Sequence, residues 1–148
     1  MIRTATTADI PALLELGAVL HQESPRYQNR TFNRDKVSAH FQACIEGAGV
    51  LFVATHGERI TGGFCGGIAE SWYGDSKTAF DYSFMVHPDY RGGSTALRLY
   101  AAFEFWAQSM GADLIQVGIT TDVRVAQTTR FYHKLGLSDA GVMFEKEI

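Results

Sequence analysis

The feature that most restricts the fold is a junction in the middle of the chain, where a strand-like run leads through a glycine-bearing turn into a helical pattern. The run is Lys77–Val86, the turn carries Arg91-Gly92-Gly93-Ser94, and apolar residues then recur at helical spacing as far as Met110. The first amides of a helix lack partners within the helix, and the helix dipole adds partial positive charge there. Glycines let the backbone approach a ligand closely, and Arg91 adds a fork of donors. The junction therefore suits an anion such as a pyrophosphate. On these residues alone, a tight strand-to-helix connection with a surface arginine is an equal alternative.

Around this junction the chain alternates strand-like and helical segments. The three consecutive strand-like runs in its middle predict an antiparallel meander, and the helix after them implies a crossover to a parallel strand. Four glycines in the second of these runs predict a bulge or a close backbone contact. The class is α/β or α+β with a mixed sheet. The predicted strands are Ile2–Ala5, Val50–Thr55, Ile60–Glu70, Lys77–Val86, Leu114–Thr120 and Gly141–Ile148, and the predicted helices are Thr7–His21, Asp35–Ile45, Ser94–Met110 and Val125–Leu135.

Composition excludes several classes of protein. The 148 residues predict a single domain spanning 1–148, and a net charge of −3 disfavours a nucleic-acid partner. No apolar run approaches the ~20 residues of a membrane span, and the first residues do not form a secretory signal. The two cysteines, Cys44 and Cys65, predict buried free thiols rather than a disulfide framework, so we expect a cytoplasmic protein.

A second block gives the junction a context. The sequence TTRFYHKLGL, Thr128–Leu137, lies on the helix after the next strand and leaves the phenol of Tyr132 at the middle of that helix. Over essentially the whole chain the combination resembles the GNAT superfamily of N-acetyltransferases. VHPDYRGGSTA resembles the family's V-x-P-x-x-R-G-x-G-x-G/A acetyl-CoA loop, and RFYHKLGL resembles its A-x-x-x-Y-x-K-x-G-F block. The longer stretch RGGSTALRLYAAFEFWAQSMGA is similar to a bacterial and phage subset of the family.

The resemblance implies a fold and a cofactor site. The fold is a mixed, mostly antiparallel sheet with helices on both faces, in which a bulge splays two neighbouring strands. The loop would hold the pyrophosphate of acetyl-CoA, and the strand before it would pair with the pantetheine arm. The residues implied for the pyrophosphate are Arg91, Gly92, Gly93, Ser94, Thr95 and Ala96, and those implied for the pantetheine are Phe84, Met85 and Val86.

Two positions depart from the family pattern. Ser94 stands where the pattern usually has glycine, and as a helix N-cap its amide would still face the phosphate. Val125 stands where the family often has asparagine, and Thr121 or Thr128 could take over that contact.

The chemistry implied is direct transfer of an acetyl group from a thioester to a primary amine in a ternary complex. Tyr132 matches the family's general acid, which would protonate the departing thiolate. The alternative interpretation is that Tyr132 is a half-buried tyrosine with only a structural role. A backbone N–H near Val86 would stabilise the oxyanion. For the general base the choice between Glu23 and Asp81 stays open.

Other expectations concern metals, substrates and partners. Four histidines (His21, His40, His56 and His133) show no metal-ligand spacing with either cysteine, so we expect no metal. Four carboxylates would favour a cationic acceptor if they lined one pocket; these are Glu23, Glu70, Asp75 and Asp81. The acceptor could be a small molecule or a protein amine, and Trp72 and Tyr73 either pack over it or anchor their loop.

The short closing strand predicts an unpaired edge and hence a homodimer. Two alternatives to an enzyme remain at this point. One is a non-catalytic acyl-CoA-binding sensor or interaction module, and the other is a nucleotide-binding domain that uses the same turn for a different phosphate.

Overall fold

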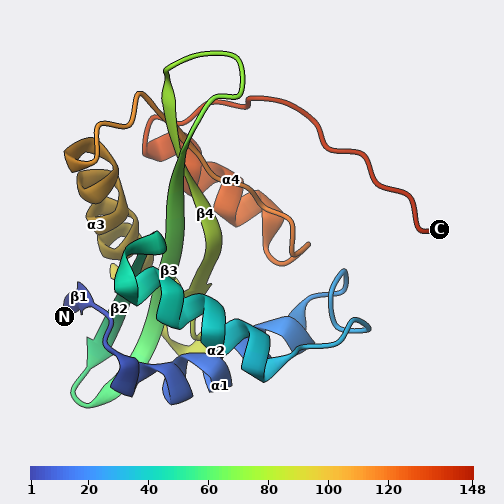
Figure 1. The fold of residues 1–148 in the computed structure, drawn as a ribbon. Helices are drawn as coiled ribbons and strands as arrows, with labels where there is room; N and C mark the ends of the chain where they lie inside the picture. The colour runs from blue at the N-terminus through green and yellow to red at the C-terminus, as the bar shows by residue number, and fades with distance from the viewer.

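A five-stranded sheet with the order β1-β2-β3-β4-β5 forms the centre of the computed structural model, which describes residues 1–148 (Figure 1). Helices cover both of its faces. The strands are β1 (Ile2–Thr4), β2 (Val50–His56), β3 (Arg59–Glu70), β4 (Lys77–Val86) and β5 (Leu114–Gln116). The α-helices are α1 (Ile10–Glu23), α2 (Arg34–Ala43), α3 (Thr95–Ser109) and α4 (Val125–Lys134). Shorter helical turns are η1 (Thr7–Asp9), η2 (Cys44–Ala48) and η3 (Pro88–Tyr90).

The strand pairing confirms the predicted topology. β2, β3 and β4 form an antiparallel meander, and β1 adds to β2 in the antiparallel sense. β4 and β5 are parallel, with α3 as the crossover between them. A parallel neighbour cannot be reached through a hairpin, which is why a helix must intervene here.

Two apolar clusters lie on opposite faces of the sheet. On one face, Leu13 of α1 and Phe41 of α2 pack with Cys65 of β3. On the other, Leu99 and Phe103 of α3 pack with the remaining buried side chains of the sheet and with α4. None of the helices combines the length and the apolar composition that a membrane crossing requires.

The glycines of β3 allow α3 to approach the sheet closely, as the sequence predicted. A Cβ atom on Gly66 would lie 2.5 Å from Cε2 of Phe103 and 2.9 Å from the carbonyl oxygen of Phe80. No side chain fits at those distances. The ring of Phe103 is therefore able to stack on Phe64 with a centroid separation of 4.3 Å.

β4 carries the bulge that the resemblance implied, and it diverges from β5. Ser83 is opposite Cys65 whereas Asp81 is opposite Gly66, so Tyr82 is an extra residue on β4. Pairing between β4 and β5 stops at Phe80 opposite Gln116. The second half of β4 thus has no neighbour on its β5 side, which opens a gap in the sheet.

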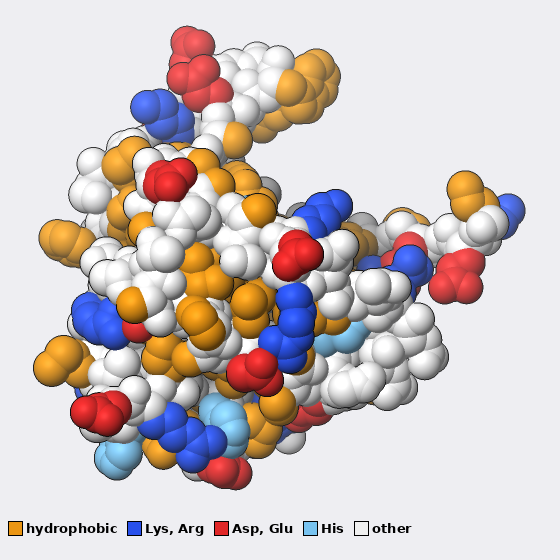
Figure 2. All heavy atoms as spheres, turned by 60° about the horizontal axis from the view of Figure 1, so that its bottom comes forward, with side chains coloured by type: hydrophobic (Ala, Val, Ile, Leu, Met, Phe, Trp, Pro, Cys, Tyr) orange, Lys and Arg blue, Asp and Glu red, His pale blue; other side chains and the backbone are white.

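Two predicted strands differ in the structure. The strand predicted for Leu114–Thr120 ends at Gln116, because beyond it the chain turns away from β4. The closing strand predicted for Gly141–Ile148 is wrong. These residues have no secondary structure and project from the body in both views (Figures 1 and 2). A strand needs a partner for its backbone groups, and within this chain the segment has none.

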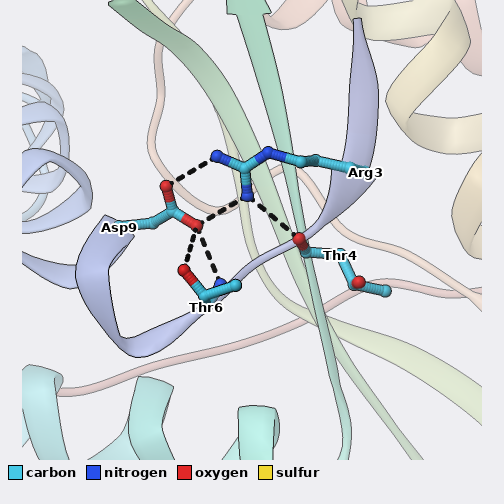
Figure 3. Close-up of polar contacts among 4 residues, drawn as sticks. All are labelled: Arg3, Thr4, Thr6 and Asp9. Atoms are coloured by element: carbon cyan, nitrogen blue, oxygen red, sulfur yellow. Dashed lines mark hydrogen bonds and ion pairs between the residues drawn. The ribbon is translucent and has the colours of Figure 1, made fainter. Parts of the chain in front are cut away.

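A polar network fixes the start of α1 against β1 (Figure 3). The guanidinium of Arg3 donates to both carboxylate oxygens of Asp9, at 2.7 and 2.8 Å. Asp9 also accepts from the backbone N–H and the hydroxyl of Thr6, at 2.8 and 3.1 Å. The arginine, with the capping bonds of Thr6, lowers the pKa of Asp9 to about 2.

Candidate active site

A cleft of about 870 Å³ lies over the second half of β4, where the sheet is open. Residues of α1, α2 and the loop between them form one side, and the start of α3 with much of α4 forms the other. The loop after α1 also contacts the chain after β5, because the hydroxyl of Ser24 donates to the carbonyl of Thr121 at 2.5 Å. The cleft exists because the bulge in β4 and the divergence of β4 from β5 leave this part of the sheet open.

The predicted acetyl-CoA loop forms one end of this cleft. Gly92 has φ +82°, a backbone region that favours glycine, and it leads the chain into α3. Ser94 is the N-cap residue of α3, but its hydroxyl caps no amide, so the first amides of the helix are without a side-chain partner. Ser94 and Thr95 lie outside the lining. The predicted cofactor residues that do line the cleft are Phe84, Met85, Val86, Arg91, Gly92, Gly93 and Ala96.

Backbone polar groups of β4 face the gap beside β5. The N–H of His87 donates to the carbonyl of Thr61 on β3, at 2.9 Å. Successive amides of an antiparallel strand point to alternate sides. The amides of Val86 and Phe84 consequently point away from β3, into the space that β5 leaves free. They are available to an extended ligand.

Arg91 is held by a carboxylate from the end of α1. Its two terminal nitrogens donate to the two oxygens of Glu23 at 2.5 and 2.6 Å, and its Nε donates to the carbonyl of Val86 at 3.1 Å. This bidentate pair lowers the pKa of Glu23. The pair joins α1 to the cofactor loop and leaves Glu23 a weak proton acceptor.

Asp81, the second candidate base, is placed by the bulge at the point where β4 and β5 separate. Its Oδ1 accepts from the backbone N–H of Gly118 at 3.3 Å, and no arginine or lysine pairs with it. Burial raises the pKa of Asp81, and the bond from Gly118 opposes that effect only in part. Asp81 is thus the more basic of the two carboxylates in the cleft.

Tyr132 of α4 lines the same cleft, and its side chain is otherwise buried. Its ring packs 5.6 Å from that of Phe131 and 6.4 Å from that of Tyr100, measured between centroids. Burial, followed by the negative charge of Asp81, raises the pKa of the Tyr132 phenol. The phenol remains protonated at neutral pH and can donate a hydrogen bond.

Some expectations about the cleft fail, and one of its residues was missed. Glu70 and Asp75 do not line the cavity, so an acidic pocket built from four carboxylates is wrong. Trp72 and Tyr73 are 94% and 75% exposed at the tip of the β3–β4 hairpin and pack on each other, at 5.5 Å. Arg124 does line the cleft, and its charge contributes to lowering the pKa of Glu23. No sequence signal pointed to this loop arginine.

Comparison with known proteins agrees with this geometry. Residues 17–137 match the Acetyltransferase (GNAT) family. The chain belongs to this family. It is an acetyl-CoA-dependent acetyltransferase. Among curated proteins, none matches the chain.

Solved structures of the GNAT fold align with the whole chain at low identity. A transcriptional regulator from Bacillus halodurans C-125 is 23% identical, with a TM-score of 0.80 over 100% of this chain and 99% of that one. A Trypanosoma brucei acetyltransferase is 18% identical, with a TM-score of 0.76 over 100% and 99%. AAC(6')-Iy, solved with the bisubstrate analogue CoA-S-monomethyl-acetylneamine, is 17% identical, with a TM-score of 0.79 over 100% and 97%. At these identities the likeness concerns the fold.

Proposed function

We propose that this GNAT acetyltransferase is an N-acetyltransferase that moves an acetyl group from acetyl-CoA to a primary amine in a ternary complex. The observation that carries the proposal is one cleft lined by the Arg91 loop, Asp81 and Tyr132 together. The Arg91 loop suits a pyrophosphate, Asp81 can accept a proton, and Tyr132 can donate one. A non-catalytic binding module would need only the Arg91 loop.

Acetyl-CoA binds across the open half of the sheet in this proposal. The free amides at the start of α3 and the glycines before them receive the pyrophosphate, with positive charge supplied by Arg91 and Arg124. The amides of Phe84 and Val86 pair with the pantetheine arm. The N–H of Val86 then stabilises the oxyanion that develops when the amine attacks the thioester carbonyl.

Asp81 is the general base in this mechanism. An ammonium has no lone pair, so the acceptor must lose a proton before it can attack. A carboxylate with a raised pKa accepts that proton more readily than an ordinary one. Glu23 acts instead as a positioning residue, because its bidentate pair with Arg91 occupies both of its oxygens.

Tyr132 is the general acid. When the tetrahedral intermediate collapses, the C–S bond breaks and the electron pair leaves on sulfur. The protonated phenol donates to that thiolate, the attacking nitrogen loses its second proton, and a proton returned to Tyr132 restores the phenol, so the products are CoA and the amide. No cysteine lines the cleft, which supports direct transfer over an acetyl-cysteine intermediate.

The acceptor end of the cleft favours an amine attached to an apolar or aromatic body. Its lining includes the rings of Tyr27, Phe32, Phe41 and Tyr82, with the one cation Lys36. Asp81 is the single carboxylate in this cleft that is free of an arginine partner. A small molecule or a protein side chain could present such an amine. The bisubstrate analogue bound by AAC(6')-Iy, which joins CoA to an amine acceptor, supports a shared cleft for both substrates.

The experiment that tests this function separates binding from chemistry. Calorimetry with acetyl-CoA is followed by an amine screen that detects the released thiol. Arg91→Ala is expected to weaken acetyl-CoA binding about tenfold to a hundredfold, the cost of a charged hydrogen bond. Arg130→Ala, an exposed arginine of α4 outside the cleft, should bind as the wild type does.

Tyr132→Phe should keep the affinity for acetyl-CoA and lower kcat by about a hundredfold or more. Tyr100→Phe is the matched control, because this neighbouring buried tyrosine does not line the cleft. Binding of acetyl-CoA without thiol release for any amine would support the sensor module. Competition by ATP that is as strong as that by CoA would support the nucleotide-binding domain.

We further propose a homodimer as the working form. β5 is an edge strand, and the projecting segment Gly141–Ile148 exposes apolar side chains that nothing in its own chain covers. In a dimer, the projecting segment of one copy could pair with the free edge of β5 in the other copy.

A further inference from the structure

Three metal-ligating atoms meet at the back of the acceptor end of the cleft. They are Nε2 of His40 on α2, Sγ of Cys44 at the start of η2, and Sγ of Cys65 on β3. The sulfurs are 3.5 Å apart, and Nε2 lies 3.8 Å from Cys44 and 3.7 Å from Cys65. All three donor atoms lie within 4.8 Å of one another.

These separations fit a tetrahedral zinc ion. With zinc–sulfur bonds of about 2.3 Å and zinc–nitrogen bonds of about 2.0 Å, tetrahedral angles place two sulfurs about 3.8 Å apart and a sulfur and a nitrogen about 3.5 Å apart. Each observed separation is within a few tenths of an ångström of these values. An ion could therefore be bound through small side-chain movements, without rearrangement of the backbone.

The surroundings of the three residues also suit an ion. Cys44 and Cys65 are 3% and 0% exposed, so their sulfurs are shielded from bulk water. His40 lines the cleft, which gives an ion a route to the buried sulfurs. Ser83 lies opposite Cys65 on the neighbouring strand, so the two side chains share a face of the sheet. The buried hydroxyl of Ser83 has no hydrogen-bond partner in the protein.

We propose that His40, Cys44 and Cys65 bind one zinc-type divalent cation, with a water molecule or the Ser83 hydroxyl as a fourth ligand. The two thiols bind as thiolates and release two protons to solvent, while the imidazole binds through its neutral Nε2. A donor set of two sulfurs and one nitrogen selects zinc over magnesium and calcium, because those two ions prefer oxygen ligands. The expectation of no metal overlooked that His40 and Cys44 lie four residues apart along a helix, and Cys65, 25 residues from His40, is brought near only by the fold.

A bound ion would change the acceptor side of the cleft. It would join α2 and η2 to β3 and fix the ring of His40. That ring packs edge-on against Tyr82, the bulge residue, with centroids 4.4 Å apart. The proposed role is thus structural: the ion holds one wall of the acceptor site in place. The proposal does not depend on acetyl transfer.

A disulfide between Cys44 and Cys65 is the competing use of the same sulfurs. It would require an oxidant to reach two thiols that are only 3% and 0% exposed. Oxidation also depends on access to the sulfur, so these groups are slow to oxidise. To prevent this oxidation, the test is made on protein kept reduced by a phosphine, which competes for Co²⁺ and Zn²⁺ less than a thiol reductant does.

Cobalt is the probe, because tetrahedral Co²⁺ with thiolate ligands absorbs in the near ultraviolet and strongly in the visible. Titration of the chelator-treated protein is expected to give both bands, saturating at one ion per chain, and Zn²⁺ should displace the cobalt. His40→Gln and Cys44→Ala should each weaken binding by more than about a hundredfold, since loss of an outer partner alone costs up to about that much. Zinc should raise the melting temperature of the wild type and not that of either variant.

His133→Gln is the control, because His133 is a half-exposed histidine paired with Asp139 on the surface. It should bind cobalt as the wild type does. His40 is partly exposed, so His40→Gln is expected to fold even if Cys44→Ala is unstable, and circular dichroism checks both. Weak visible bands without thiolate absorption would mean adventitious binding at the surface and would overturn the proposal. An unchanged affinity of folded His40→Gln for Co²⁺ would also overturn the proposal.

Discussion

At the scale of single residues, the two carboxylates of the cleft differ in basicity because only one has a cationic partner. The pKa of Glu23 is lowered by Arg91, whereas burial raises that of Asp81. For Asp81→Asn we expect kcat to fall by about a hundredfold to ten-thousandfold, the usual contribution of a general base. The acid limb of the pH–rate profile should be absent in Asp81→Asn. In the wild type that limb should lie above the ordinary carboxylate range, since a base acts only when deprotonated.

Asp81→Asn should also change the pKa of the Tyr132 phenol. The charge of Asp81 helps to raise the pKa of this phenol, so its removal should lower that pKa, as ultraviolet titration of the tyrosines would detect. Glu23→Gln is the comparison: as a positioning residue it should affect acetyl-CoA affinity more than kcat. Retention of the acid limb in Asp81→Asn and its loss in Glu23→Gln would reverse the two assignments.

A local motif was enough to predict which residues line the cleft, whereas residues brought together by a distant contact could not be predicted. The Arg91 loop and Tyr132 were predicted at one site because each lies within a short pattern on one element, and both line the cleft. The choice between Glu23 and Asp81 could not be made, because Arg91 lies 68 positions from Glu23 in the chain. Cys65 was not connected with His40 for the same reason, because 25 residues separate them.

At the scale of elements, the junction of β1 and α1 depends on the ion pair between Arg3 and Asp9 (Figure 3). The pKa of Asp9 falls from 3.8 to about 2 on folding. A carboxyl group whose pKa is lowered by folding stabilises the folded state while it is ionised. This contribution is complete well above pH 3.8 and is lost as the pH falls through about 2.

Asp9→Asn tests this contribution with little change in shape. At neutral pH it should lower the free energy of unfolding by about 1 to 2 kcal/mol, a value discounted because Arg3 is partly exposed. The difference from the wild type should shrink as the pH falls from about 4 towards 2. Urea unfolding at several pH values measures it, and Glu15→Gln, at an exposed surface pair, should show almost no difference. A pH-independent difference would mean that the hydrogen bonds to Thr6, and not the charge, stabilise the junction.

Element prediction succeeded where a segment's own pattern was sufficient. β4 was predicted at its observed bounds, Lys77–Val86, and α4 to within one residue. The closing strand failed although its residues alternate as those of a strand do. Alternation describes which faces side chains occupy, but a strand also needs a neighbour with free backbone groups, and the sequence does not say where that neighbour is.

At the scale of the whole molecule, the unpaired segment Gly141–Ile148 and the edge strand β5 predict assembly. Val142 and Phe144 are 80% and 92% exposed, and they occupy the same side of an extended chain. Two ion pairs join the segment to its own chain, Glu147 with Arg30 and Glu145 with Arg26. Their carboxylates are 92% and 64% exposed, so the pairs contribute little to holding the segment. Exchange of this segment between two copies would cover the apolar side chains and pair the free edge.

Light scattering over a concentration series should therefore give twice the 16.3 kDa mass of the chain. Phe144→Lys places a charge on the segment without removing any contact within the monomer, and it should shift the mass towards that of one chain. Phe105→Lys, at a 74% exposed position on α3, is the control and should leave the dimer intact. A mass of one chain for the wild type at every concentration would exclude the dimer. A dimer unaffected by Phe144→Lys would assign the interface to another surface, such as the exposed tip of the β3–β4 hairpin.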